Sequence, residues 1–242
     1  MGREQHGARR DVHIHSSGSP VPPIVDDQLR MSSSVYVHVV DDDEAVRNSL
    51  ADLLRSMGYR TTLHASAAGF LDAELPDAPG CLLLDVRLPD TSGLELQEYL
   101  KRADVRLPVI LMTGFGDIAM SVRGMKAGAV DFLTKPFREE DLLRAIHTAI
   151  AQDSEARRGR ADLARWNQRL SSLTPRERDV LPLIVSGLLN KQAAAKLGIS
   201  EVTLQIHRGN VMKKMGAESF ADLVRMAVAL GIPITHSRHG EG

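Results

Sequence analysis

The sequence is short of cysteine, of aromatic side chains and of long apolar runs. Its single cysteine, Cys81, excludes an internal disulfide and a zinc cluster built on several thiolates. Aromatic residues make up 4% of the 242 residues, too few for a ligand cage or a base-stacking platform. No run approaches the roughly 18 apolar residues of a membrane span, and the N-terminus lacks the apolar core of a secretory signal. These absences predict a cytoplasmic protein with no membrane partner, in which Cys81 is a small buried residue.

The net charge of -1 hides two halves of opposite sign. Residues 31–155 contain 12 basic and 20 acidic residues and carry -8, whereas residues 156–242 contain 14 basic and 7 acidic residues and carry +7. A chain of this length is long enough for two small domains, each with its own core. The charge division therefore predicts two domains with different partners, and the basic half is the candidate for binding nucleic acid.

The first 34 residues differ from the rest in composition. Residues 1–34 are rich in serine, proline, glycine and histidine and show no apolar periodicity. Such a segment buries too little apolar surface to offset the entropy of ordering it, so we predict that it is disordered. Met31, just before the first predicted strand, is a candidate translation start.

From Val35 onward, short apolar runs alternate with helical periodicity. We predict strands at 35–40, 59–64, 81–84, 109–112 and 130–133, and helices at 44–57, 66–75, 93–102, 117–127 and 138–151. Continuous Val, Ile and Leu runs indicate strands buried on both faces, and strand-helix alternation requires parallel crossovers. Residues 35–151 are therefore predicted to form a doubly wound α/β domain with a five-stranded parallel sheet, whose function lies beyond the carboxyl ends of its strands.

Polar side chains stand at four of these strand ends. The first strand ends in Asp41-Asp42-Asp43-Glu44, the third in Asp85 and the fourth in Thr113, and the fifth is followed by Lys135. Because the strands are parallel, these ends meet at one edge of the sheet. Crowded carboxylates repel one another unless they share a cation, and oxygen ligands in an open, hydrated site suit Mg²⁺. The pattern predicts a Mg²⁺-dependent reaction at Asp85.

The same residue types suit phosphoryl transfer, which needs positioning and positive charge more than covalent machinery. Asp85 is the candidate nucleophile, Lys135 the partner of a phosphoryl oxygen, and Thr113 a hydrogen-bond donor to the phosphoryl group. Lys135-Pro136 is a candidate cis peptide. Taken singly, Asp85 also fits a strand-end turn residue and Lys135 a solvated side chain, so the hypothesis depends on their joint occurrence.

These segments resemble the receiver domain of two-component response regulators. The resemblance covers about 35–151 and rests on residues 40–43, 84–93, 112–114 and 126–137. It implies a flavodoxin-like fold, phosphorylation of Asp85 by a sensor histidine kinase, and Thr113 and Lys135 as switch and phosphate-binding residues. It also implies that Mg²⁺ is held by Asp41, Asp42, Asp85 and the backbone carbonyl of Arg87. Phe132 occupies the position of the family's rotating switch aromatic, with a plain core aromatic as the alternative.

After about residue 151 the sequence predicts helices only. Residues 152–167 are predicted to be a partly helical linker, 168–232 an all-α domain and 233–242 a tail. Thr174-Pro175-Arg176-Glu177 is a capping box that starts a helix, and Pro182 within that helix predicts a kink. Further helices are predicted at 190–197, 201–214 and 219–230.

The helices at 190–197 and 201–214 are separated by Gly198-Ile199-Ser200, a spacing typical of a helix-turn-helix. We expect an inward apolar face formed by Ala194, Leu197, Ile199, Val202 and Ile206. The outer face would carry Lys191, Thr203, Gln205, His207, Arg208, Lys213 and Lys214. Taken alone, this basic face fits a solvated surface as well as a DNA-binding surface.

Residues 168–232 closely resemble the LuxR-type helix-turn-helix, so the whole chain resembles response regulators of the FixJ and NarL class. The resemblance implies that the helix at 201–214 enters the major groove of double-stranded DNA. It places Gln205, Ile206 and Arg208 near base edges and Lys191, Thr203 and Lys213 near phosphates. For His207, a phosphate contact and a core position both remain open. Gly209 stands where some members carry a basic residue.

The combined hypothesis is a transcription factor and not an enzyme. Phosphorylation of Asp85 would promote homodimerisation and promoter binding, with RNA polymerase as a further candidate partner. One alternative is a small-molecule phosphatase, but such enzymes place a second Asp two residues after the nucleophile, where this chain has Arg87. The other alternative is a DNA-binding regulator that is independent of phosphorylation and keeps a vestigial switch.

Overall fold

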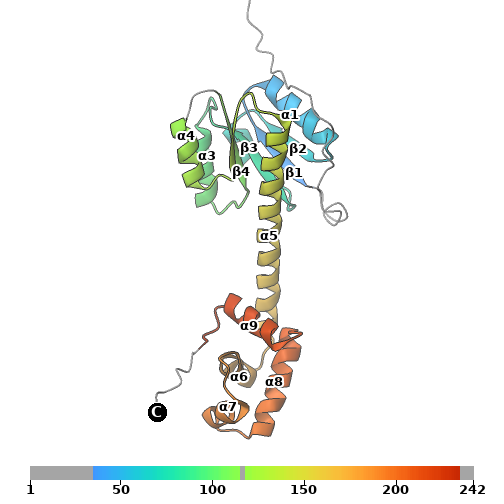
Figure 1. The fold of residues 1–242 in the computed structure, drawn as a ribbon, viewed down its shortest axis with the longest axis vertical. Helices are drawn as coiled ribbons and strands as arrows, with labels where there is room; N and C mark the ends of the chain where they lie inside the picture. The colour runs from blue at the N-terminus through green and yellow to red at the C-terminus, as the bar shows by residue number, and fades with distance from the viewer. Residues whose placement is uncertain (1–34, 115–117, 235–242) are drawn as a thin grey trace, which may run out of the picture. The chain divides into compact units, whose positions relative to one another are not determined.

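The computed structural model describes residues 35–114 and 118–234 (Figure 1). The predicted disorder of residues 1–34 and nearly all of the predicted tail at 233–242 lie outside these ranges. The chain divides into two compact units, residues 1–157 and 158–242, each with its own core.

The first unit is a five-stranded parallel sheet in the order β2-β1-β3-β4-β5. This confirms the predicted doubly wound α/β fold, because each strand is followed by a helix. The strands are β1 (Tyr36–Val40), β2 (Arg60–His64), β3 (Gly80–Asp85), β4 (Val109–Thr113) and β5 (Asp131–Thr134). The helices are α1 (Glu44–Ser56), α2 (Ala67–Leu71), α3 (Gly93–Arg102), α4 (Ile118–Ala127) and α5 (Glu139–Ser171).

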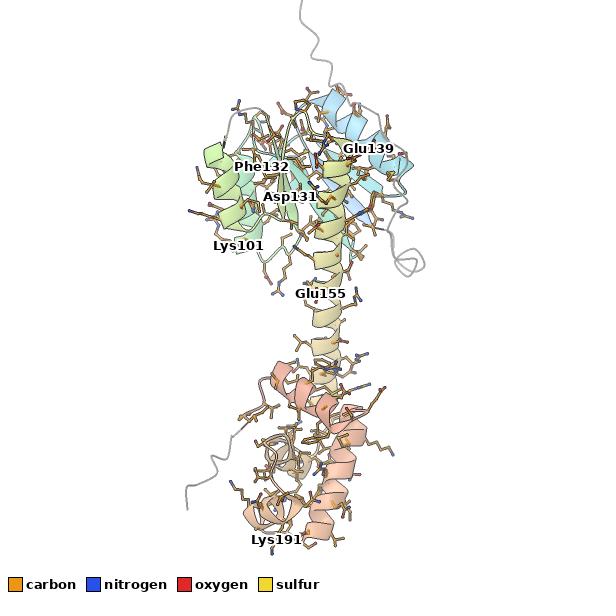
Figure 2. The ribbon with its side chains drawn as sticks, in the orientation of Figure 1. Lys101, Asp131, Phe132, Glu139, Glu155 and Lys191 are labelled. Carbon is orange, nitrogen blue, oxygen red and sulfur yellow. The ribbon has the colours of Figure 1, made fainter. Side chains whose placement is uncertain are left out.

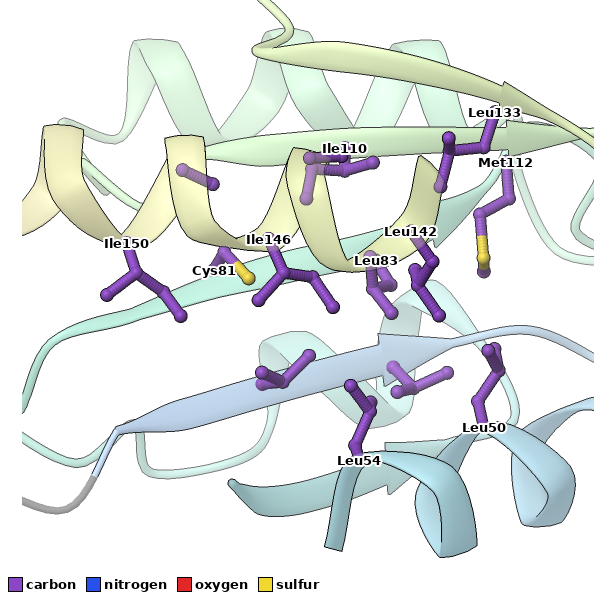
Figure 3. Packing of buried hydrophobic residues seen from close by; sticks show 14 of the residues in the cluster. Leu50, Leu54, Cys81, Leu83, Ile110, Met112, Leu133, Leu142, Ile146 and Ile150 are labelled. Atoms are coloured by element: carbon purple, nitrogen blue, oxygen red, sulfur yellow. The ribbon is translucent and has the colours of Figure 1, made fainter. Parts of the chain in front are cut away.

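Successive residues of the central strands pack on opposite faces of the sheet, as the period of a strand requires. On one face, Cys81 and Leu83 of β3 lie in a cluster with apolar residues of α1 and α5 (Figure 3). On the other face, Leu82 and Leu84 pack with Leu94 and other residues of α3. Both faces are buried, which explains the uninterrupted apolar runs. Cys81 is fully buried, as predicted, and burial raises the pKa of its thiol.

Helix α5 is longer than the predicted helix at 138–151 and continues through the predicted linker to Ser171. Within the first unit, the buried carboxylate of Asp153 holds this helix against the sheet. Asp153 Oδ2 accepts hydrogen bonds from the backbone N of Gly80 at 3.0 Å and from Arg157 Nε at 2.8 Å. Gly80 is required at the start of β3, because a Cβ there would collide with the carbonyl oxygen of Tyr36.

The second unit is helical throughout its described part. It contains the end of α5 followed by α6 (Pro175–Val185), α7 (Asn190–Leu197), α8 (Glu201–Met215) and α9 (Phe220–Ala229). The predicted capping box begins α6: Glu177 N donates to Thr174 Oγ1 at 3.3 Å, and Thr174 N donates to Glu177 Oε2 at 2.8 Å. Helix α6 continues through Pro182. The core includes Trp166, Leu181, Ile184, Leu204, Val211 and Leu223.

The predicted inward face of α8 is partly wrong. Val202 and Ile206 are 70% and 59% exposed, whereas Leu204 and Val211 are fully buried. Apolar side chains lie on both sides of this helix, so the spacing of 202 and 206 is as helical as that of 204 and 211, and only tertiary packing selects the inward set. Ala194 is buried as expected, and Leu197 and Ile199 pack against the core while half-buried.

Candidate functional site

The carboxyl edge of the sheet in the first unit brings together four of the residues predicted from sequence. Carboxylate oxygens of Asp41, Asp42 and Asp85 lie within 4.8 Å of one another. Their proximity follows from the pairing of β1 with β3, in which Val40 is opposite Leu84. Lys135 Nζ lies 2.5 Å from Asp41 Oδ2 and 2.5 Å from Asp85 Oδ2. The bond between Lys135 and Pro136 is cis, as predicted.

Backbone amides orient the two buried carboxylates. Asp41 Oδ1 accepts from Asp43 N at 3.0 Å, and Asp85 Oδ1 accepts from Arg87 N at 2.9 Å. Asp43 in turn caps α1, because its Oδ1 accepts from Ala45 N at 2.8 Å. The run of acidic residues after β1 therefore has two tasks, since Asp41 and Asp42 line the site while Asp43 starts the helix. The sequence signal for the Asp43 cap is the residue type itself, because Asp is a common N-cap residue, but the prediction from sequence did not include it.

Excess negative charge is a property of this cluster. Burial raises the pKa of Asp41, against the effect of the Lys135 ammonium group. Burial alone would lower the pKa of Lys135, but hydrogen bonds and charges from Asp41 and Asp85 outweigh it and raise that pKa. Three neighbouring carboxylates and one ammonium group leave the cluster with an excess of negative charge that a divalent cation would offset. An all-oxygen donor set, with Asp42 exposed to water, fits Mg²⁺.

Thr113 ends β4, one residue after Met112, which pairs with Asp85. Thr113 is 1% exposed, and its Oγ1 has no hydrogen-bond partner among residues 35–114 and 118–234. Its backbone carbonyl accepts from Lys135 N at 2.6 Å, so β4 and the segment after β5 are fixed to each other here. A buried hydroxyl without a partner is energetically costly. The arrangement is therefore suited to a ligand that brings an acceptor oxygen.

Phe132 and Arg87 complete the predicted set in the first unit. Phe132, labelled on β5 in Figure 2, is half-buried and packs against the apolar cluster on the α3 side of the sheet. It therefore contributes to the core while part of its ring remains accessible. Arg87 is exposed directly after Val86, and its backbone forms an isolated bridge with Ser92.

In the second unit, α7 and α8 form the predicted helix-turn-helix. Helix α7 ends at Gly198, whose φ of +66° is the left-handed conformation that glycine adopts without strain. Ser200 caps α8 by accepting a hydrogen bond from Thr203 N at 3.1 Å. Two helices separated by a three-residue turn are the geometry expected for groove binding.

The residues predicted to contact DNA differ in exposure. Lys191 (Figure 2), Gln205, Ile206 and Lys213 are exposed, whereas Thr203, His207 and Arg208 are half-buried. Thr203 Oγ1 lies 2.8 Å from Ser200 Oγ. The Nδ1 atom of His207 is buried and has no partner in the part of the chain that the structure describes.

Two groups in this unit were missed by reasoning from sequence. The guanidinium group of Arg208 donates to Asn190 Oδ1 at 3.1 Å and lies 5.1 Å from the centre of the Phe220 ring. Lys214, predicted on the outer face, donates to the buried carboxylate of Glu177 at 2.6 Å. These partners come from other helices, so no local pattern signals them.

Comparison with known protein families finds two matched regions in the chain, one in each of the two units. Residues 37–147 match the response regulator receiver domain, and residues 171–227 match the bacterial regulatory proteins of the luxR family. These matches identify a regulator and not an enzyme, as predicted.

Individual relatives match over most of their length. The chain is 47% identical over 206 residues to nodulation protein W of Bradyrhizobium diazoefficiens, covering 85% of this chain and 91% of the relative. It is 46% identical over 202 residues to the transcriptional regulatory protein FixJ of Azorhizobium caulinodans, covering 84% and 96%.

Solved structures agree with the sequence comparisons. The structure of the response regulator StyR matches with a TM-score of 0.71 and 45% identity, covering 81% of this chain and 99% of StyR. Full-length FixJ from B. japonicum matches with a TM-score of 0.52 and 41% identity, covering 84% of this chain and 100% of that FixJ chain.

Among the described residues, no helix combines the length and apolar character needed to cross a membrane. The chain belongs to the two-component response regulators that join a receiver domain to a LuxR-type DNA-binding domain and regulate transcription.

Proposed function

We propose that this response regulator is activated when a sensor histidine kinase transfers a phosphoryl group to Asp85. A carboxylate oxygen of Asp85 bonds to phosphorus while the bond from phosphorus to the imidazole nitrogen of phosphohistidine breaks. The electron pair of the broken bond stays on that nitrogen, which takes up a proton. The observation that carries this proposal is the buried hydroxyl of Thr113, which has no hydrogen-bond partner among the described residues, at the end of β4 where the Thr113 carbonyl accepts from the backbone of Lys135, the partner of Asp85. This hydroxyl would donate to a phosphoryl oxygen.

The other residues at this edge would balance the negative charge of the phosphoryl group. Lys135, already 2.5 Å from Asp85, would pair with a second phosphoryl oxygen. Asp41, Asp42, Asp85 and the backbone carbonyl of Arg87 would hold Mg²⁺. The bound ion supplies positive charge that offsets the negative charge of the transferred group.

We further propose that phosphorylation creates a homodimer. Movement of Thr113 toward the phosphoryl group would draw Phe132 inward and reshape the surface of α4, β5 and the start of α5. Exposed Val122 and Met125 on α4, at 48% and 46%, supply apolar surface for such an interface. Changing the inactive-to-active ratio from 99:1 to 1:99 requires about 5.5 kcal/mol of differential stabilisation.

The dimer would bind double-stranded DNA in the cytoplasm, with RNA polymerase as a further candidate partner. In this proposal α8 enters the major groove, where Gln205, Ile206 and Arg208 lie toward base edges. Contacts to phosphates would come from Lys191, Thr203, His207 and Lys213. The exposure of Lys191, Gln205, Ile206 and Lys213 supports this proposal, whereas Arg208 would reach DNA only from the edge of α8, beside Asn190.

Phosphorylation is tested by incubating the full chain with Mg²⁺ and acetyl phosphate. The intact mass should increase by one phosphoryl group in the native protein and in the control Asp52→Asn, whose carboxylate is exposed on α1. Asp85→Asn should remain unmodified. Size-exclusion chromatography should show dimers only for the two modified proteins. Phosphorylation of Asp85→Asn, or equally tight DNA binding with and without phosphorylation, would contradict the proposal.

DNA binding is tested by its dependence on salt. If about six phosphates are contacted, the slope of log K against log salt should be about -5. Lys191→Ala and Lys213→Ala should each reduce this slope by about one. Lys101→Ala, an exposed substitution in the receiver (Figure 2), is the control and should leave it unchanged. Binding that does not respond to salt is incompatible with the proposed contacts.

A further inference from the structure

Helix α8 exposes two aliphatic side chains on the surface proposed to meet DNA. Val202 and Ile206 are 70% and 59% exposed and lie one helical turn apart. Gln205 and Gly209 belong to the same exposed stripe. Aliphatic side chains stand beside each other here without contributing to the core of the unit, which uses Leu204, Val211 and Met215 of the same helix. The stripe therefore requires an explanation outside the folding of this unit.

The centre of this stripe carries no charge. Val202, Gln205, Ile206 and Gly209 are all neutral, while the guanidinium group of Arg208 is directed to Asn190 and Phe220. Guanine is most often read by Arg or Lys, which donate to its O6 and N7 atoms in the major groove. Val202, Gln205, Ile206 and Gly209 do not offer such a donor, and Arg208 lies at the edge of the stripe, where it already contacts Asn190 and Phe220. The centre of the stripe is therefore poorly suited to reading guanine.

The chemistry of the stripe fits an A·T base pair. In the major groove, thymine presents a C5-methyl group, and adenine presents the N6 donor and N7 acceptor that Gln pairs with. We propose that Val202 and Ile206 contact thymine methyl groups and that Gln205 pairs with an adjacent adenine, so that each half-site contains A·T pairs where α8 lies. This inference rests on the proposed DNA binding by α8 and adds the sequence class of its target.

Gly209 supports a close approach of α8 to the bases. Glycine in a helix interior is destabilising relative to alanine. The packing of the unit does not require it, because an added Cβ at position 209 would meet no atom of the described residues within 4 Å beyond its chain neighbours and the nearby backbone of α8. Without a side chain at this position, the helix backbone can lie nearer to the floor of the groove. This brings Ile206, one turn away, within van der Waals distance of a methyl group.

The test begins with selection from a randomised double-stranded DNA library by the full-length protein treated with acetyl phosphate. Selected duplexes should contain A·T pairs at fixed positions in each half-site. Each such thymine is then replaced by deoxyuridine, which lacks only the C5-methyl group and keeps its base pairing. Loss of one contacted methyl should weaken binding about fourfold, the factor that corresponds to burying one methyl group.

Variants assign the effect to the two side chains. The double variant Val202→Ala, Ile206→Ala should bind thymine and deoxyuridine duplexes equally. The control Val228→Ala, which is 61% exposed on α9, should keep the fourfold difference. Thermal unfolding followed by the fluorescence of Trp166 verifies that the variants fold.

Two results would overturn the inference. One is equal binding of thymine and deoxyuridine duplexes by the native protein, and the other is selection of G·C pairs throughout the half-site. A failure of the DNA binding by α8 on which this inference rests is distinguishable, because then no duplex is enriched and no DNA is bound by the phosphorylated chain. Failure of the phosphorylation switch alone would leave the selected base pairs to be read with the unphosphorylated protein.

Discussion

The receiver unit and the DNA-binding unit place their functional groups differently with respect to their cores. In the receiver unit, Asp41, Asp85 and Thr113 are at most 8% exposed at the edge of an apolar sheet. In the DNA-binding unit, Val202 and Ile206 are more than half exposed, and the core lies on the other side of α8. Buried charges depend on their partners for stability, whereas exposed side chains do not. Function and stability therefore share residues in the receiver, whereas they are separate at the exposed side chains Val202 and Ile206 of the DNA-binding unit.

Intrinsic fluorescence allows this comparison to be tested in the full chain. The only tryptophan, Trp166, belongs to the DNA-binding unit, and all three tyrosines, Tyr36, Tyr59 and Tyr99, belong to the receiver. Unfolding followed at the two chromophores reports the two units separately.

The largest effect is expected from Lys135→Ala in the receiver. The substitution removes the ammonium group between Asp41 and Asp85 and leaves two buried carboxylates without their cation. We expect the free energy of unfolding of the receiver to fall by roughly 3 to 5 kcal/mol in EDTA, with part of the loss recovered on adding Mg²⁺. Urea unfolding by circular dichroism measures this. The urea transition of the DNA-binding unit, followed by Trp166 fluorescence, should not move. An equal shift of the receiver and Trp166 transitions would show that the two units do not differ in this way.

A matched pair on one helix tests the DNA-binding unit. Leu204→Ala removes a fully buried side chain from the core and should lower the free energy of unfolding by about 2 to 5 kcal/mol. Ile206→Ala, two residues away, should change it by less than about 0.5 kcal/mol. Urea titrations followed by Trp166 fluorescence compare the two. A large loss for Ile206→Ala would show that the exposed stripe also supports the fold.

Acid should affect the receiver at higher pH than the DNA-binding unit. Burial, and secondarily the nearby His64, lowers the pKa of His38 from 6.5 to about 4. Below pH 6.5 the unfolded receiver takes up a proton that the folded receiver does not accept until near pH 4. The free energy of unfolding should therefore fall across this window, by up to roughly 3 kcal/mol.

In the DNA-binding unit, Glu177 is a carboxyl group whose contribution to stability persists to lower pH than that of His38. A hydrogen bond from Lys214 lowers the pKa of this carboxyl below its usual 4.5, so the stabilisation it provides is present above pH 4.5 and is lost only in stronger acid. Urea midpoints measured at each chromophore between pH 7 and pH 4 test the order of the two losses. His38→Gln should flatten the profile of the receiver, and an unchanged profile in that variant would assign the effect to other groups.

A smaller effect, of opposite sign, is expected from Gly209→Ala. Alanine at this exposed helical position should raise the free energy of unfolding of the DNA-binding unit by about 1 kcal/mol. If α8 approaches DNA closely at this point, the same variant should bind its selected duplex more weakly. Ala195→Gly, an exposed position in α7, is the converse control and should lower stability without such a change in binding. Tighter binding by Gly209→Ala would count against close approach.

Much of the receiver could be predicted from its sequence because topology left few choices. Uninterrupted apolar runs such as 81–84 occur in strands covered on both faces, and parallel strands direct their ends to one edge. Asp85 and Lys135, 50 residues apart, were therefore expected to meet, and they do.

The DNA-binding unit was harder to predict because its helices have apolar residues on more than one side. Val202 and Ile206 satisfy helical spacing as well as Leu204 does, and only the packing of α6 and α9 decides between them. The partners of Arg208 and Lys214 lie 18 and 37 residues away, at distances that no local pattern encodes. The length of α5 was underestimated because its polar continuation lacks an apolar period.

The hydrogen bond from Gly80 to Asp153 has a consequence for synthesis of the chain on the ribosome. A nascent receiver that has emerged only to residue 151 contains every strand but lacks the acceptor for the first amide of β3. The two hydrogen bonds of Asp153 Oδ2 can form only after Asp153 and Arg157 have left the exit tunnel, at the very end of the receiver unit. An isolated receiver prepared for study should accordingly extend to Arg157.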